Sequence, residues 1–194
     1  MLFTKRRFSV VEGRIREDIR DDDGRVVLKL NLRFPEIKCG DRDPMAGHAR
    51  RLYSDLSKGF ADYARSELKT VATRAYRACG EGFLPFSALM SYSVTLDDGR
   101  LLSVSVDISV SDGIGSPRVV RKTQVWDRTR GLKCDVCRFL SKETVKCFAK
   151  SLSEEERKAF DRSLFSVDAE GVCFYLLIDG GYSERRVGFD TLKN

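Results

Sequence analysis

Two cysteines have the spacing that most suggests chemistry. Cys134 and Cys137 are separated by two residues, as in half of a zinc knuckle or in a redox-active dithiol. Cys147 and Cys173 could complete a set of four thiolate ligands, although they do not repeat that spacing. A redox pair favours a helix N-terminus, which lowers the thiol pKa, whereas this pair is expected in a loop after a strand. We therefore expect buried or unreactive thiols, and retain Cys134 and Cys137 as the metal-ligand candidates.

The chain contains one histidine, His48, on which any nucleophilic triad or histidine-rich metal site would depend. It is expected in the first turn of a helix, where a solvated side chain is the ordinary outcome. No Gly-x-Ser-x-Gly elbow or phosphate-binding glycine loop accompanies it. The sequence therefore predicts no catalytic residue, no cofactor and no enzyme activity.

Basic residues cluster in a predicted strand and in the turn after it, with a tryptophan among them. They are Arg118, Arg121, Lys122, Arg128, Arg130, Lys133 and Arg138, and the tryptophan is Trp126. A strand face that combines cations with an aromatic ring could bind phosphates and stack a base, although a solvated sheet face is more common. The residues of this possible binding face are Arg121, Lys122, Trp126, Arg128 and Arg130.

The composition is that of a folded, well-solvated chain. Its 194 residues are 42% hydrophobic and 33% charged, with 35 basic and 29 acidic residues and a net charge of +6. These values exclude a disordered chain and give only a mild basic bias. There is no run of about 18 apolar residues, and Lys5, Arg6 and Arg7 precede too short an apolar stretch for a signal peptide. We therefore expect a cytoplasmic protein whose six cysteines are thiols rather than disulfides.

Alternating hydrophobicity predicts a hairpin of residues 8–20 and 25–34. The apolar residues of the second strand lie at even positions, whereas Ile15 and Ile19 lie at odd positions. Because paired residues share a face of the sheet, the sum of their positions must be odd, which requires a loop of even length. We therefore predict a two-residue turn, Asp23-Gly24.

A second hairpin needs a different loop. Its apolar residues, within 90–94 and 102–108, lie at even positions in both strands, so the loop must be odd. We predict a three-residue loop, Asp97-Asp98-Gly99, with Gly99 in the left-handed region. Residues 117–127 are predicted to form the third strand of this meander.

A long amphipathic helix is predicted between the hairpins, from an Asp43 N-cap and Pro44 to Gly80. It would contain about 35 residues, with a bend near Gly59 as the alternative to a straight rod. Its apolar positions recur in steps of three or four and predict a stripe that lies along a sheet: Met45, Ala49, Leu52, Leu56, Phe60, Tyr63, Leu68, Val71 and Ala75.

The last third of the chain is predicted to hold a short strand into Cys134, two short helices and a final hairpin. Ser153 and Glu156 have capping-box spacing for the second helix. Residues 172–178 are apolar on both faces and predict a doubly buried strand, followed by a turn at 179–181 and an edge strand at 186–189. The fold class is therefore α+β: an antiparallel sheet of hairpins packed against one long helix, with two short helices, in a single domain over residues 1–194.

Five sequence segments are similar, in the same order, to segments of one bacterial family. They are Phe34-Pro35-Glu36-Ile37; Tyr92–Leu96 followed by Leu101–Val110; Trp126–Gly131; Asp168–Tyr175; and Val187–Leu192. The chain thereby resembles the domain of unknown function at the extracellular end of the RsiV anti-sigma factor, which also occurs near the N-terminus of some peptidoglycan deacetylases (DUF3298 with part of DUF4163).

The resemblance implies a non-catalytic binding or sensory module for a protein or a cell-envelope ligand. In the anti-sigma factor, such a domain senses lysozyme by binding it. The resemblance assigns no ligand residues here, because none of the five segments marks them. Family members are typically exported or membrane-anchored, whereas this sequence shows neither signal. The alternative hypothesis is a cytoplasmic, nucleic-acid-associated protein that uses the basic residues of 118–138.

Overall fold

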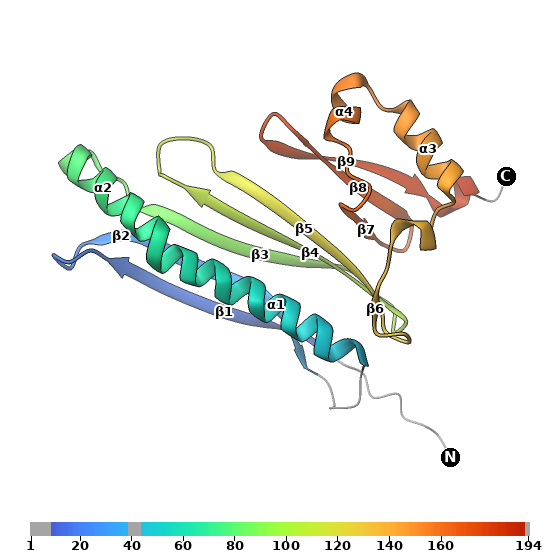
Figure 1. Ribbon diagram of the computed structural model, residues 1–194, viewed down its shortest axis with the longest axis horizontal. Helices are drawn as coiled ribbons and strands as arrows, with labels where there is room; N and C mark the ends of the chain where they lie inside the picture. Colours follow the sequence, from blue (N-terminus) through green and yellow to red (C-terminus); the bar gives the residue numbers. More distant parts are fainter. Residues whose placement is uncertain (1–8, 39–43, 193–194) are drawn as a thin grey trace, which may run out of the picture. The chain divides into compact units, whose positions relative to one another are not determined.

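The computed structural model describes residues 9–38 and 44–192, which form an α+β fold of two sheets, one long helix and short helices (Figure 1). The strands are β1 Ser9–Arg20, β2 Val26–Lys38, β3 Phe86–Asp97, β4 Leu101–Ser111, β5 Arg118–Asp127, β6 Leu132–Lys133, β7 Phe165–Val167, β8 Gly171–Ile178 and β9 Gly181–Gly188. The helices are α1 Pro44–Tyr63, α2 Lys69–Cys79, α3 Lys142–Ser151 and α4 Glu154–Ala159, with a π-helical segment at Ala64–Leu68 and 3₁₀ turns at Gly80–Gly82, Val136–Arg138 and Phe189–Leu192. One sheet has the order β1-β2-β3-β4-β5-β6 and the other β7-β8-β9. The predicted fold class is confirmed.

Contacts between residues divide the described chain into two units, which we treat separately. Unit 1 contains the residues up to Tyr92 together with Val106–Val120. Unit 2 contains Ser93–Ser105 together with the residues from Arg121 onward. The single domain over residues 1–194 stays a prediction. Within the described residues, none of the helices has both the length and the hydropathy needed to cross a bilayer.

The first hairpin has the predicted register but a different turn. The residue numbers of each pair add to an odd number, as predicted, from Ser9↔Lys38 to Ile19↔Leu28. However, Asp21 N–H donates to the carbonyl of Arg25, so the loop holds three residues and ends at Gly24, whose φ is +80°. The two-residue turn was therefore wrong, because the Asp21 carboxylate binds the N–H groups of Asp23 and Arg25 and fixes a longer loop.

A three-residue loop alone would give paired residue numbers with even sums. A β-bulge explains why the sums are nevertheless odd along most of the hairpin. Arg20 pairs with Val26, whereas Ile19 pairs with Leu28, so Val27 is an extra residue in β2. Val27 and Leu28 are consecutive and both fully buried, which the bulge permits.

The long helix connects two parallel strands. β2 and β3 are neighbours, with Leu28 opposite Phe86 and Leu32 opposite Met90. Parallel neighbours require a crossover, and the helix supplies it. The sequence analysis predicted only antiparallel hairpins, because the pairing of β2 with β3 joins strands that are far apart in the sequence.

The helix has the predicted length, and the alternative of a break near Gly59 is not observed. Segments of 20, 5 and 11 residues follow one another without a break, and Gly80 ends the helix as predicted. The irregularity is the π-helical segment Ala64–Leu68 rather than Gly59, which lies inside α1. The predicted N-cap, Asp43, lies outside the described residues.

The buried side of the helix consists largely of small residues: Ala49, Tyr53, Ser57, Ala61, Ala64, Leu68 and Ala72. Part of the predicted stripe was wrong, because Leu52, Tyr63 and Val71 are 38%, 40% and 51% exposed. Alanines allow the helix to approach the sheet closely, which leaves the larger side chains at the flank. Figure 1 shows the helix running along β1 and β2.

The second hairpin has the predicted three-residue loop, shifted by one position. β3 ends at Asp97 and β4 begins at Leu101, and Gly99 has a φ of +84°. The Asp98 carboxylate accepts hydrogen bonds from the N–H groups of Leu101 and Arg100, and these bonds lower the pKa of Asp98.

Unit 2 is built around β8. Its residues are buried from Gly171 to Leu176, which confirms the predicted doubly buried strand over most of its length. The ring of Phe174 lies 4.8 Å from that of Phe148 in α3 and 5.3 Å from that of Phe160 after α4. The predicted capping box of Ser153 is present at the start of α4. β9 is longer than predicted, and β7 was not predicted.

The small-residue side of the helix gives a stability prediction. Ala61 is 1% exposed, so Ala61→Leu should overpack the contact and lower the free energy of unfolding by about 1–3 kcal/mol. Leu52→Ala, on the exposed flank, should cost less than about 1 kcal/mol. Urea denaturation measures both. The assignment of the buried side is wrong if Leu52→Ala is the more damaging substitution.

Candidate ligand-binding site

The unit 1 sheet has one buried and one exposed face. Leu28, Leu30 and Leu32 are at most 1% exposed, whereas the intervening Lys29, Asn31 and Arg33 are exposed. Successive strand residues point to opposite faces, so the helix covers one face of β2 and leaves the other in solvent. We call this second face of unit 1 the open sheet face. It comprises Glu12, Arg14, Arg16, Asp18, Lys29, Asn31, Arg33, Leu89, Ser91, Asp107, Ser109 and Val119.

A hollow of about 350 Å³ lies in the open sheet face. Its lining residues are Asn31, Arg33, Leu89, Met90, Ser91, Asp107, Ser109 and Val119, and all of them belong to unit 1. Four strands contribute to it, from β2 to β5. It combines one cation, one carboxylate, an amide and two hydroxyls with apolar side chains.

Charges of both signs lie beside the hollow, because Asp18 is opposite Lys29 across the β1–β2 ladder and Asp107 belongs to the lining. Arg14 lies opposite Arg33 across the β1–β2 ladder, and Arg16 lies opposite Asn31. Arg14 forms an ion pair with Glu12, whereas Arg33 forms none within 4 Å in the described part of the chain. The Glu12 carboxylate offsets the charge of Arg14, so Arg33 is the arginine of this pair whose charge remains available to an anionic ligand.

The charges on this part of the sheet also act on Tyr92, the last unit 1 residue of β3. Burial raises the pKa of the Tyr92 phenol, and the Glu12 carboxylate raises it further. The positive charge of Arg33 acts in the opposite direction. At this phenol the Glu12 carboxylate outweighs the positive charge of Arg33.

Two arginines of the predicted binding face are held by internal contacts. The Arg121 side chain is 19% exposed and lies over the rings of Tyr175 and Tyr182, at 4.5 Å and 5.2 Å from their centroids. Arg121 also lies 3.5 Å from the Glu184 carboxylate. The Arg128 side chain is 9% exposed and forms an ion pair with Asp97.

The other three predicted residues lie in different environments. Trp126 is 6% exposed, whereas Lys122 and Arg130 are exposed. The structure therefore does not bring the five residues onto one open surface, and a base could not stack on the buried indole without displacing its neighbours. The role of this stretch in binding stays a prediction.

Asp127 organises the turn after β5. Its carboxylate is buried, lies 2.5 Å from the Arg138 guanidinium and accepts hydrogen bonds from the N–H groups of Thr129 and Arg130. Burial raises the pKa of Asp127, but these hydrogen bonds and the charge of Arg138 outweigh it and hold the pKa below its ordinary value. Arg138, part of the basic cluster, therefore has a structural contact.

The predicted cysteine pair is divided between two environments. Cys134 is buried and Cys137 exposed. Burial raises the pKa of Cys134, and the hydrogen bond with Asp135 is the main cause that raises the pKa of Cys137. Neither thiol is thereby activated. No group of three or more His, Cys, Asp or Glu side chains in the described residues is placed to hold a metal ion. His48 is exposed on α1.

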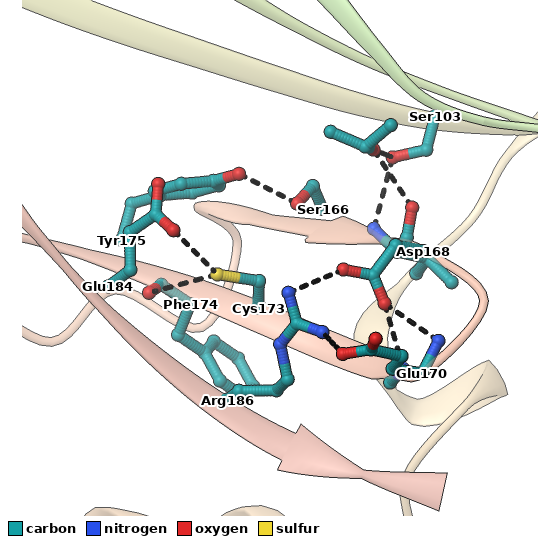
Figure 2. A network of polar contacts seen from close by, with 12 residues as sticks. Ser103, Ser166, Asp168, Glu170, Cys173, Phe174, Tyr175, Glu184 and Arg186 are labelled. Atoms are coloured by element: carbon teal, nitrogen blue, oxygen red, sulfur yellow. Dashed lines mark hydrogen bonds and ion pairs between the residues drawn. The ribbon is translucent and has the colours of Figure 1, made fainter.

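A polar network holds the β7–β9 sheet of unit 2 (Figure 2). Ser103 accepts a hydrogen bond from the N–H of Val167, and the hydroxyls of Ser166 and Tyr175 lie 2.8 Å apart. The Cys173 thiol, whose pKa burial raises, lies 3.8 Å from the Glu184 carboxylate.

Arg186 belongs to the same network and lines a second, largely apolar hollow of about 450 Å³ between α3 and β9. Its guanidinium lies 2.7 Å from the Asp168 carboxylate and also pairs with Glu170 (Figure 2). Its charge is therefore compensated within unit 2. The hollow of the open sheet face is the better candidate site, because Arg33 is not compensated in this way.

The structure shares its α+β fold with solved structures of the DUF3298 family, a family of domains of unknown function. A DUF3298-family protein from Bacteroides fragilis aligns with a TM-score of 0.64 and 12% identity, over 98% of this chain and 94% of that chain. One from Pseudomonas aeruginosa aligns with a TM-score of 0.55 and 12% identity, over 96% and 92% of the two chains. No protein-family model and no curated protein matches the chain. The fold implied by the DUF3298 part of the sequence resemblance is thus confirmed, whereas the RsiV-like role and the DUF4163 part stay predictions.

Sequence patterns alone did not predict the hollow, although they contained part of its signal. The alternation of Lys29, Asn31 and Arg33 with leucines predicted a polar face of β2. Ser91 and Ser109 lie in predicted strands too, but only the parallel β2–β3 pairing places Asn31 beside Leu89.

The lowered pKa of Asp127 predicts a pH-dependent contribution to stability. Its stabilisation is complete above the unfolded-state pKa of about 3.9 and is lost as the pH falls through the lower folded-state pKa. Asp127→Asn should cost about 1–3 kcal/mol at pH 7 and progressively less below pH ~4. Asp22→Asn, in an exposed turn, is the control. A pH-independent loss in urea denaturation would contradict this assignment.

Proposed function

We propose that the chain is a non-catalytic binding or sensory module whose ligand, a protein or a cell-envelope molecule, docks on the open sheet face. The observation that carries the proposal is the hollow between Arg33 and Ser109, which combines an arginine that forms no ion pair within the described residues, one carboxylate, hydrogen-bonding groups and partly exposed apolar side chains. Such a combination is typical of ligand sites, where apolar surface supplies affinity and a few polar groups fix orientation.

The support from the rest of the structure is geometric. β2 and β3 are paired directly, and the helix packs against β2. Asn31 and Leu89 therefore lie on paired strands rather than on a loop. Binding at such a surface needs no rearrangement of the backbone. The sequence resemblance to the RsiV ectodomain makes lysozyme one protein ligand to test, and cell-wall fragments are the other class.

The nucleic-acid hypothesis has less support from the geometry. Its stacking residue, Trp126, is buried, and Arg121 and Arg128 already have anionic partners. Only Lys122 and Arg130 of the five residues are exposed, and two exposed cations fit a solvated sheet face as well as a binding surface.

The proposed function is tested by blocking the hollow. Ser91→Trp should weaken binding of lysozyme or of solubilised cell-wall fragments at least tenfold in calorimetry, because the indole would occupy part of the hollow of about 350 Å³ and cover polar groups of its lining. Lys58→Trp, on the exposed side of α1, adds the same ring elsewhere and should leave binding unchanged.

Two results would contradict the proposed function. One is that neither lysozyme nor cell-wall fragments bind the wild-type chain. The other is that the Ser91→Trp variant, shown by circular dichroism to be folded, binds as tightly as wild type.

A further inference from the structure

We infer that the hollow binds a glycan that carries a carboxylate, with Arg33 as the ligand of that carboxylate. The inference rests on the proposed function and deepens it, because it names the chemistry of the ligand. It is based on the polar and apolar side chains that line the hollow, on the arginine among them and on the lack of aromatic residues in the lining.

The polar lining fits a ligand that is rich in hydroxyl groups. Asn31, Ser91 and Ser109 can each donate and accept hydrogen bonds, as sugar hydroxyls do. The Asp107 carboxylate adds acceptor oxygens and has more acceptor sites than one interaction occupies. Donors and acceptors therefore face the hollow from three adjacent strands, an arrangement that matches neighbouring hydroxyls on a sugar ring.

The apolar lining fits the C–H surface of a sugar ring. Leu89 is 42% exposed, and Val119 is partly buried on β5. Both line the hollow. Contact between these side chains and a sugar ring would remove apolar surface of both partners from water, which contributes to affinity. Hydrogen bonds that only replace hydrogen bonds to water contribute less.

The charge beside the hollow favours an anionic ligand. Arg33 lines the hollow and forms no ion pair within the described residues, whereas Arg14 is paired with Glu12 and Lys29 lies opposite Asp18. A guanidinium binds a carboxylate through two parallel hydrogen bonds. A neutral glycan would leave Arg33 without such a partner.

The lining does not favour a single-stranded nucleic acid. A single-stranded nucleic acid gains much of its affinity from bases that stack on aromatic rings. None of the residues that line the hollow is aromatic. Phosphate binding at Arg33 would thus lack the stacking surface that such ligands use.

Calorimetry with the full chain tests the inference. The probes are oligogalacturonate and hyaluronan oligosaccharides as carboxylated glycans, maltohexaose as a neutral glycan, and oligothymidylate as a nucleic acid. We expect at least one carboxylated glycan to bind about tenfold or more tightly than maltohexaose and oligothymidylate.

Substitutions locate the carboxylate contact. Arg33→Gln should weaken binding of the carboxylated glycan about tenfold and leave maltohexaose binding unchanged. Arg33→Lys keeps the charge but not the two-bond geometry and should give an intermediate loss. Arg74→Gln removes the same charge from the exposed side of α2 and should have no effect.

The inference is overturned if neither carboxylated glycan binds, if maltohexaose binds equally well, if oligothymidylate binds more tightly, or if Arg33→Gln, verified as folded, has no effect. These failures differ from failure of the proposed function. If lysozyme or cell-wall fragments bind and Ser91→Trp abolishes their binding, the open sheet face remains a ligand site and only the ligand chemistry is wrong.

Discussion

The close contact between the long helix and one face of the unit 1 sheet is the interaction on which the rest of the structure depends. Alanines at 49, 61, 64 and 72 are at most 1% exposed, so the helix backbone lies near the strands. The leucines of β2 are buried by this contact. Because side chains alternate along a strand, the same contact leaves Lys29, Asn31 and Arg33 in solvent.

The helix also determines which strands become neighbours. As the crossover between β2 and β3, it makes them parallel and places Asn31 beside Leu89, although these residues are far apart in the sequence. The β3–β4–β5 meander then adds Asp107, Ser109 and Val119. The hollow is thus a product of topology, and the proposed preference for a carboxylated ligand depends on Arg33.

Local patterns predicted the local structure well. Alternation and helical periodicity gave the first hairpin's register, the helix length and the buried strand β8, because each depends on neighbouring residues. The Asp23-Gly24 turn was wrong, because the Asp21 carboxylate stabilises a longer loop that periodicity does not encode. Leu52 and Val71 were expected to be buried because hydrophobicity alone ranks them above alanine, whereas close packing favours the alanines. The environments of Arg121 and Trp126 depend on β8, β9 and other distant residues, so their burial could not be read from the basic stretch itself.

The most direct test of the open sheet face as a ligand site is to map the ligand by NMR. Backbone amide shifts would be recorded while hyaluronan or oligogalacturonate oligosaccharides are added to the isotope-labelled chain. The largest changes should fall on four residues of unit 1, namely Asn31, Arg33, Ser91 and Ser109. Changes that concentrate within residues 121–130 instead, or a spectrum that does not change, would contradict this expectation.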